Sequence, residues 1–118
     1  YIYSEPEFSW EIPIGVTAIE FPNSNDFKKY NDFLFVADTN NGIIYKFKLN
    51  ETRTNFIFES TNLQDNVLNM LKDSSGNESM DEIIFAKNLG IISDMKFGPD
   101  GALYVISLME GKIYKIFS

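Results

Sequence analysis

The feature of this sequence that most constrains its fold is an internal repeat. Residues 33–49 (FLFVADTNNGIIYKFKL) align without a gap with residues 102–118 (ALYVISLMEGKIYKIFS). Six aligned positions are identical, among them the triplet Ile-Tyr-Lys. Repetition of this kind indicates a solenoid, a propeller or another array of similar units. Because one such unit cannot bury its apolar face alone, we expect the chain to belong to a larger object.

The repeat continues upstream, where residues 17–21 match residues 93–97. Both segments alternate apolar and polar residues, which is the period of a half-buried strand. The link that follows is the tight turn 98–101 in the second copy, with the Gly, Pro and Asp residues that turns require. In the first copy the link is the longer segment 22–32, so the two matched blocks are separated by unequal loops.

Two further strands are predicted in each copy. Residues 33–38 and 102–107 are apolar runs that predict inner strands, and each is followed by a short loop ending in glycine. The third strand of the first copy, residues 43–49, has its counterpart in residues 112–117. Strands joined by short turns without a covering helix favour an antiparallel meander.

The other segments are less regular. Residues 82–87 (EIIFAK) predict an outer fourth strand for the first unit, and residues 7–12 (EFSWEI) predict an outer strand of the second or an adjacent unit. Residues 55–59 favour a short strand, residues 63–72 have apolar positions at helical spacing, and residues 73–81 have the composition of an exposed loop.

Four antiparallel strands per repeated unit are typical of β-propeller blades. We therefore expect an all-β fold of antiparallel four-stranded blades, about two blades of a six-bladed propeller. The first blade is placed at residues 15–87 and the second at residues 91–118. The second blade lacks its own fourth strand, which residues 7–12 would supply if they do not belong to another blade.

Composition excludes several functions. The formal net charge of −7 argues against nucleic acid and anionic lipid as partners, and no run approaches the ~18 apolar residues of a membrane span. The 118 residues contain no Cys and no His, which excludes disulfides, thiolate sites and His-dependent triads or zinc sites. The start at Tyr1, without Met or a leader, predicts a processed chain or an excised fragment.

Several motifs together resemble the C-terminal third of the glucose/sorbosone dehydrogenases, the soluble quinoprotein sugar dehydrogenases. The resemblance covers nearly the whole chain except residues 50–81. Its residues are Tyr3-x-x-Pro6, Trp10, Ile14-Gly15-x-Thr17, the run FLFVAD with IIYKFKL, and DMKFGPDGALYV at residues 94–105.

The resemblance implies a six-bladed β-propeller that binds pyrroloquinoline quinone (PQQ) and calcium and oxidises aldose sugars. It implies hydride transfer from the C1 carbon of the sugar to the quinone, with a His base from blades that this chain does not contain. It also implies an extracytoplasmic or secreted location, a sugar ligand, and the remaining propeller blades as partners. The fragment would contribute the wall of the active-site funnel near Asn40 and Asn41.

The chain departs from the family at the positions that hold PQQ. The family's cofactor-contacting Lys corresponds to Asn40, beside Asn41, and its Arg-x-Arg corresponds to Ile91 and Ser93. Each lost charge-assisted hydrogen bond is worth roughly 1.5–3 kcal/mol. We therefore predict no catalytic residue and no metal ligand here, no cofactor bound by this chain alone, and only a positional role for Asn40 and Asn41.

Two functional hypotheses follow. The chain is either the C-terminal part of a PQQ-dependent sugar dehydrogenase, not catalytic on its own, or a non-catalytic propeller module for binding or scaffolding that has lost quinone binding. A His-bearing loop and basic quinone contacts upstream would favour the enzyme. In either case two blades expose apolar faces and open strand edges, so we expect contact with remaining blades or self-association through those edges.

Other candidate sites have simpler interpretations. Residues 38–42 (DTNNG) resemble a calcium loop, but the spacing fails by one residue, and a hairpin turn with positive φ at Asn41-Gly42 is favoured. Asp38, Asp94 and Asp100 would form an acid–base site only if they converged, and turn-capping or surface roles are the default.

Two sequons and one aromatic residue remain open. Asn50 and Asn77 begin N-x-S/T triplets in predicted loops, where glycosylation of an exported protein would occur. Trp10 is either a sugar-stacking platform or, as we favour, a buried aromatic between blades.

Overall fold

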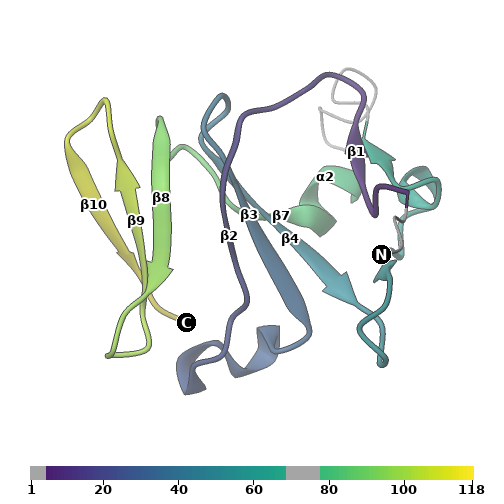
Figure 1. The fold of residues 1–118 in the computed structure, drawn as a ribbon, viewed down its shortest axis with the longest axis horizontal. Helices are drawn as coiled ribbons and strands as arrows, with labels where there is room; N and C mark the ends of the chain where they lie inside the picture. The colour runs from purple at the N-terminus through teal and green to yellow at the C-terminus, as the bar shows by residue number, and fades with distance from the viewer. Residues whose placement is uncertain (1–4, 69–77) are drawn as a thin grey trace.

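The computed structural model describes residues 5–68 and 78–118, which form a predominantly β fold with antiparallel sheets. Figure 1 shows two sheets side by side, one of β8, β9 and β10 and the other built on β2, β3 and β4. Helix α2 and strand β1 lie beyond the second of these sheets in this view. Neither sheet closes on itself within the described ranges. No helix in these ranges is long and apolar enough to cross a membrane.

The first sheet is a meander of β2 (Val16–Glu20), β3 (Phe33–Asp38) and β4 (Ile43–Leu49). The outer edge of β4 pairs antiparallel with β7 (Ile84–Ala86) along one part and with β5 (Phe56–Ile57) along another. The fourth strand predicted near residues 82–87 is therefore confirmed over Ile84–Ala86.

The second sheet repeats this meander with β8 (Ile92–Phe97), β9 (Leu103–Ser107) and β10 (Lys112–Ile116). The repeat extends to its irregularities, because the first strand of each sheet has a register shift at the same place. These shifts lie between Val16 and Ala18 and between Ile92 and Asp94. Two segments that match in sequence therefore fold alike, as the repeat predicted.

The main core lies between the two sheets. Side chains alternate along a strand, so each sheet directs every second residue to this core. The first sheet contributes Phe35, Ala37 and Ile44, and the second contributes residues of all three strands. The buried members from the second sheet are Ile92, Met95, Leu103 and Val105.

The long link 22–32 has a structural role in this core. It forms the 3₁₀ segment η1 (Asn25–Tyr30), whose Phe27 is fully buried. The Phe27 ring packs against Phe97 of the second sheet, with the ring centroids 5.1 Å apart. The Ser24 hydroxyl also donates to the carbonyl oxygen of Gly101 at 2.8 Å. The extra residues of the first link therefore join the two sheets at their lower end in Figure 1.

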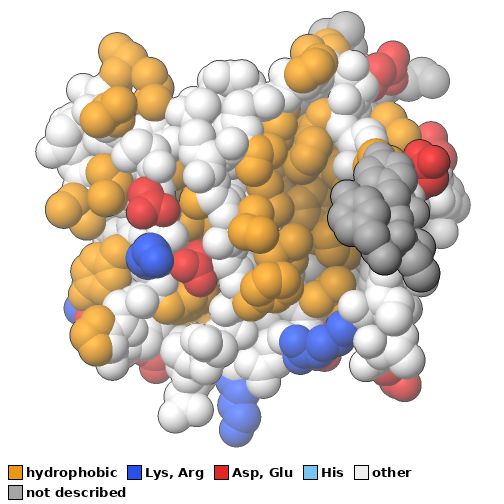
Figure 2. Space-filling model, in the orientation of Figure 1, with side chains coloured by type: hydrophobic (Ala, Val, Ile, Leu, Met, Phe, Trp, Pro, Cys, Tyr) orange, Lys and Arg blue, Asp and Glu red, His pale blue; other side chains and the backbone are white. Residues whose placement is uncertain are grey.

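The opposite face of the first sheet is covered over β3 and β4 by other parts of the same chain. Val36, Tyr45 and Phe47 are buried there. The covering residues come from the N-terminal segment and from the region between β4 and β7. They are Phe8, Trp10, Ile14, Phe56, Phe58, Leu63, Leu68, Met80 and Ile83. Figure 2 shows hydrophobic side chains gathered over β2, β3 and β4 in the middle of the same view.

The N-terminal strand is placed differently from the expectation. Within residues 7–12, β1 (Ser9–Trp10) pairs in parallel with β6 (Val67–Leu68), and not with β10. The prediction that residues 7–12 complete the second unit is therefore wrong for this structure. The aromatic residues of this segment reach the buried face of the first sheet, and this burial positions the strand.

The insert also differs from its predicted structure. The helix expected over residues 63–72 is absent up to residue 68, where η2 (Thr61–Leu63) is followed by β6. Asn66 has a φ of 61°, which interrupts a helix, and residues 69–72 lie outside the described residues. Within the loop expected at 73–81, the described part begins the helix α2 (Glu78–Ile83), whose Met80 and Ile83 are buried against the first sheet.

Candidate functional site

The loops at one end of the two sheets form a continuous surface, which we call the loop edge. It consists of Gly15 and residues 38–42, 88–91 and 107–111. The Thr39 N–H donates to the Gly15 carbonyl at 2.8 Å, and the Leu89 N–H donates to the Gly42 carbonyl at 3.0 Å. The loops of both repeat copies are therefore held together by backbone contacts.

Gly42 lies at the closest approach between these loops. Its φ is 65°, and a Cβ atom added there would lie 2.8 Å from the backbone nitrogen of Gly90. Gly111 occupies the same place in the second hairpin with a φ of 60°, but it has no neighbouring atom within 4 Å of such a Cβ. The loop at 38–42 is thus a hairpin turn as predicted, with the positive φ on Gly42 alone within that turn.

Asp38 is the fully buried carboxylate of the loop edge. Its Oδ1 accepts the backbone N–H of Asn40 at 2.9 Å and that of Gly15 at 3.3 Å. Its Oδ2 accepts the side-chain amide of Asn41 at 2.6 Å. These bonds fix the hairpin loop and tie it to the entry of β2, so the carboxylate has a turn-capping role.

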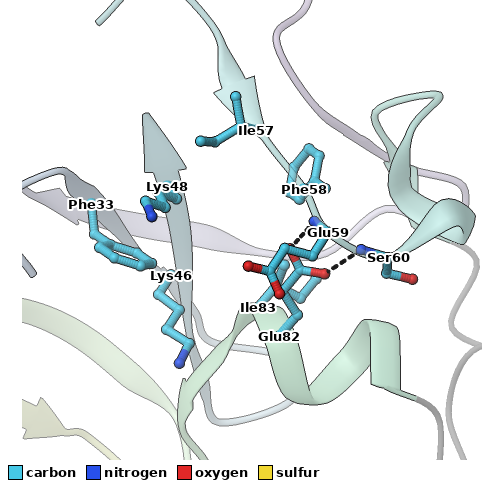
Figure 3. A pocket seen from close by; sticks show the side chains of 9 residues that line it. All are labelled: Phe33, Lys46, Lys48, Ile57, Phe58, Glu59, Ser60, Glu82 and Ile83. Atoms are coloured by element: carbon cyan, nitrogen blue, oxygen red, sulfur yellow. Dashed lines mark hydrogen bonds between the residues drawn. The ribbon is translucent and has the colours of Figure 1, made fainter. Parts of the chain in front are cut away.

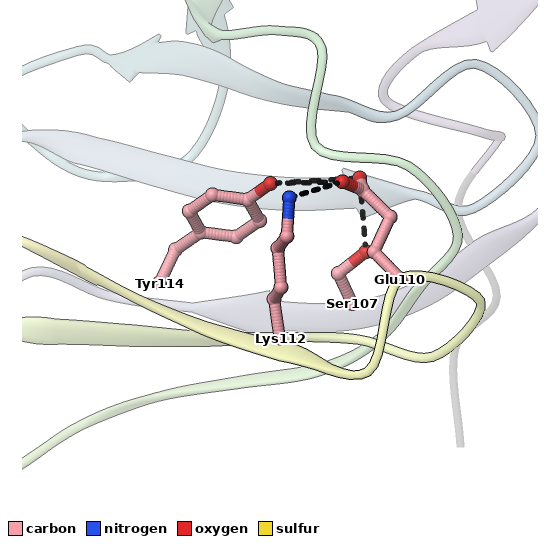
Figure 4. A network of polar contacts seen from close by, with 4 residues as sticks. All are labelled: Ser107, Glu110, Lys112 and Tyr114. Carbon is pink, nitrogen blue, oxygen red and sulfur yellow. Dashed lines mark hydrogen bonds and ion pairs between the residues drawn. The ribbon is translucent and has the colours of Figure 1, made fainter.

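The second repeat copy has a related network with the roles of the groups reversed (Figure 4). Ser107 replaces the buried Asp38, and Glu110 replaces Asn41. The Glu110 carboxylate pairs with Lys112 at 3.1 Å and lies 3.3 Å from the Tyr114 hydroxyl, which donates to it. The hydrogen bond from Lys112 holds the pKa of Glu110 below its usual range, with smaller contributions from Tyr114 and Ser107.

Tyr45 lies beneath the loop edge on the covered face of the first sheet and is fully buried. Burial raises the pKa of its hydroxyl to about 12, and the nearby Asp38 carboxylate acts in the same direction. The nearby indole of Trp10 acts in the opposite direction and lowers the pKa of the Tyr45 hydroxyl. The two groups do not form a hydrogen bond of ordinary geometry, and neither Trp10 Nε1 nor the Tyr45 hydroxyl has another partner among the described residues. Trp10 is half-buried and packs edge-on against Tyr45 and Phe8, so its ring belongs to the core cluster of the first sheet.

Asn40 and Asn41 lie on the loop edge, where the family resemblance places the quinone. Asn41 donates its amide to Asp38, and the positions of the family's Arg-x-Arg hold the half-buried Ile91 and the exposed Ser93. Two carboxylates lie on this edge, and both have partners: Asp38 accepts the Asn41 amide, and Glu110 pairs with the ammonium of Lys112. A quinone with three carboxylates does not fit an edge of this chemistry.

The three aspartates that sequence analysis grouped do not converge. Asp38 lies on the loop edge. Asp100 lies in the turn between β8 and β9, where it accepts the Tyr104 hydroxyl at 2.6 Å and the Ala102 N–H at 3.1 Å. Hydrogen bonding from Tyr104, then from Ala102 and Lys115, lowers the pKa of Asp100 to about 2. Asp94 accepts the N–H of its neighbour Met95 at 2.9 Å, and this is its one hydrogen bond within the described ranges.

The first sequon lies in a structured turn, and acidic side chains do not cluster as metal ligands in the described part of the chain. Within residues 5–68 and 78–118, no group of three or more acidic side chains is placed to hold a metal ion. Asn50 uses its side chain to fix the turn after β4, where its Oδ1 accepts the Thr54 N–H at 2.8 Å and its Nδ2 donates to the Thr54 hydroxyl at 3.1 Å. The other sequon residue, Asn77, lies outside the described residues.

A cleft of about 620 Å³ lies between β4, β5 and α2, away from the loop edge (Figure 3). Lys46 and Lys48 project from β4 on one side, and Glu59 and Glu82 lie on the other. The Glu82 carboxylate accepts the backbone N–H groups of Glu59 at 2.8 Å and Ser60 at 2.9 Å. Glu82 therefore fixes the chain after β5, and the residues that line the cleft include no arrangement of nucleophile and base.

Sequence reasoning missed Glu82 and Glu110 as network residues. For Glu110 a signal was present, because the repeat aligns it with Asn41 and aligns Ser107 with Asp38. Glu82 has no such signal, since its partners are backbone groups more than twenty residues away in an irregular insert.

Comparison of the chain with protein-family models, curated proteins and solved structures finds no match. The assignment of function therefore depends on the geometry described above and on the motifs of the sequence.

Proposed function

We propose that this chain is a pair of blade-type units of a β-propeller and acts as a non-catalytic binding or scaffold part of that assembly. The observation that supports this most directly is the repetition of one meander in two sheets. Both copies share the register shift in the first strand and a hairpin loop that ends in a glycine with positive φ, 65° at Gly42 and 60° at Gly111. Packed, repeated antiparallel sheets of this kind are the building units of propellers.

The chemistry of the loop edge supports a non-catalytic role. The groups that would have to contact a bound quinone are Asn40, Ile91 and Ser93, and none of them is cationic. The buried carboxylate there is used to hold a turn, and the lysine is used to neutralise Glu110. An acidic and internally satisfied edge favours packing or recognition of neutral polar groups over binding of a tricarboxylate.

The second candidate is the C-terminal part of a PQQ-dependent sugar dehydrogenase, extracytoplasmic, with its quinone, calcium and catalytic His all supplied by other blades. The run from Asp94 to Val105 favours it, because the resemblance to the family is most continuous there. In that protein Asn40 and Asn41 would line the funnel as neutral groups facing the sugar. We rank it second, because the Lys and Arg-x-Arg positions of the family have no basic residue here.

Titration calorimetry of the chain with PQQ, with and without calcium, tests the proposal. We expect no saturable heat up to about 1 mM, where a site worth about 4 kcal/mol would be half filled. A variant carrying Asn40→Lys, Ile91→Arg and Ser93→Arg is the informative comparison. Weak binding by this variant alone would indicate that only charge is missing, whereas saturable micromolar binding by the natural chain would refute the proposal.

A further inference from the structure

The repeat assigns equivalent faces to the two sheets. We call the face of the first sheet that meets the second sheet its A face, and the opposite face its B face. The A face contains Phe35, Ala37 and Ile44, and the B face contains Val36, Tyr45 and Phe47. In the alignment of the two copies, the A face of the second sheet is Tyr104, Ile106 and Ile113, and its B face is Val105, Tyr114 and Ile116.

The interface inside this chain joins unlike faces. The A face of the first sheet packs on the B face of the second, since Ala37 and Ile44 share one core with Val105 and the flanking Tyr114. The contact is therefore head to tail, and the same rule can be applied again at each end. Two faces then have no partner sheet within the chain. They are the A face of the second sheet at one end and the B face of the first sheet at the other.

The two outer faces differ in how far other parts of the chain cover them. The B face of the first sheet is covered over β3 and β4 by the chain's own N-terminal segment and insert, so Tyr45 and Phe47 are almost completely buried. It stays open along β2, where Ile19, the register partner of Val36, is 57% exposed. The A face of the second sheet remains open, with Ile113 70% and Ile106 41% exposed, and with Phe117 69% exposed beside them. Figure 2 shows hydrophobic side chains along the margin of the view where β10 lies.

The open face also has an open edge. Strand β10 pairs only with β9 among the described strands, whereas its counterpart β4 pairs with β7 on the corresponding side. Exposed apolar residues next to an unpaired strand are a surface that folded proteins usually cover. Two features of the first unit, a covered A face and a fourth strand, are thus missing from the second.

We propose that the A face of the second sheet is the docking surface for a further meander of the same repeat, which presents a B face to Ile106 and Ile113 and adds a strand along β10. This inference deepens the proposed function and rests on it, because it names the partner of the array. A second copy of this chain is not the occupant, since the β3 and β4 part of its remaining B face is covered by its own residues. The same face carries charges of both signs, on Asp94, Lys96 and Lys115, whose register partners in β9 are Ile106 and Tyr104. A neighbour with an apolar centre and polar margins fits such a surface.

The sequence also specifies the shape of the occupant. Ala37 of the first A face becomes Ile106 in the second, and Phe35 becomes Tyr104. The larger Ile106 needs a smaller residue opposite it than the one that faces Ala37. The Tyr104 hydroxyl is already used by Asp100. The B face that docks here is therefore flatter near Ile106 than the B face of the second sheet.

A tandem extension tests this inference with the full chain. A second copy of residues 82–118 is joined after Ser118 through a short Asn-Gly-Ser linker, so that the copied β7 can pair with β10. In the copy, Val105→Ala makes room for the Ile106 of the natural sheet, since Val105 shares a core with the smaller Ala37 in the natural chain. The copy also carries Ile106→Thr, Ile113→Lys and Phe117→Ser, because its own A face would otherwise bind the dye in place of the face that it covers. We expect binding of the apolar dye ANS to fall several-fold, the β10 amides to gain protection from hydrogen exchange, and the chain to remain monomeric by sedimentation.

The substitution Ile113→Lys provides the matched control in both chains. Because Ile113 is 70% exposed, this variant should fold like the natural chain when unextended. In the extended chain it should restore dye binding, because the lysine lies inside the new interface. Unchanged dye binding in the extended chain would overturn the inference, as would a dimer of the natural chain that Ile113→Lys dissociates. Neither result depends on PQQ, so it is separate from the test of the proposed function.

Discussion

The substitutions Gly42→Ala and Gly111→Ala separate two effects that usually act together. The two glycines end equivalent hairpin loops, with φ values of 65° and 60°, so an alanine side chain has the same conformational cost at both positions. For the left-handed region this cost is about 1–2 kcal/mol. Only Gly42 faces another segment of backbone, at Leu89 and Gly90.

The difference between the two variants can be estimated from the structure. At Gly111 the new methyl group meets nothing within 4 Å, so the loss should stay at about 1–2 kcal/mol. At Gly42 the methyl group would lie 2.8 Å and 2.9 Å from backbone atoms of Gly90, which cannot rotate away. Displacing that segment costs about 1–3 kcal/mol in packing. It also costs about 1 kcal/mol for the hydrogen bond between Leu89 and Gly42.

Urea unfolding followed by the fluorescence of the single tryptophan, Trp10, measures both variants. We expect Gly42→Ala to lower the free energy of unfolding by about 3–6 kcal/mol and Gly111→Ala by about 1–2 kcal/mol. Equal losses would refute the contact between the loops of the two repeat copies. The m-value should be unchanged for Gly111→Ala, which checks that its unfolding remains two-state.

Two other predictions concern the polar groups near the loop edge. Asp38→Ala should lower the free energy of unfolding by about 3 kcal/mol or more, because two short hydrogen bonds to a buried carboxylate are lost. Asp94→Ala, whose carboxylate accepts an adjacent N–H, should cost below about 1 kcal/mol, and a reversed order in thermal unfolding would contradict the assigned roles. Tyr45→Phe should be neutral or stabilising at pH 7, since the hydroxyl has no hydrogen-bond partner of ordinary geometry among the described residues. Its raised pKa favours the neutral hydroxyl in the folded chain, so the natural protein should lose stability between pH 10 and about 12, and Tyr45→Phe should lack this part of the loss in pH-dependent unfolding.

The sequence predicts the paired meanders because their signals are local and occur twice. Alternation in residues 93–97 and the glycine that ends each hairpin loop specify strands and turns without reference to the rest of the chain. The fourth strand at Ile84–Ala86 could also be predicted, because β-branched and aromatic residues follow one another there.

The remaining segments are positioned by burial, which a local pattern does not contain. Residues 7–12 alternate like a strand of the array, yet Trp10 reaches the covered face of the first sheet and the strand pairs with β6. Leu63, Val67 and Leu68 belong to an apolar pattern with helical spacing, but Leu63 and Leu68 are buried around the turn at Asn66. The polar networks of Glu82 and Glu110 depend on tertiary contacts in the same way.

Methyl–methyl nuclear Overhauser effects test most directly whether the two repeat units pack head to tail. The chain has four methionines, so the methyl signal of Met95 has few others of its kind to be distinguished from. Our account predicts cross-peaks from Ala37 and Ile44 to Met95 and Val105, which share one core. Cross-peaks from Ile44 to Ile113 instead would show that like faces meet, and this result would contradict the head-to-tail arrangement.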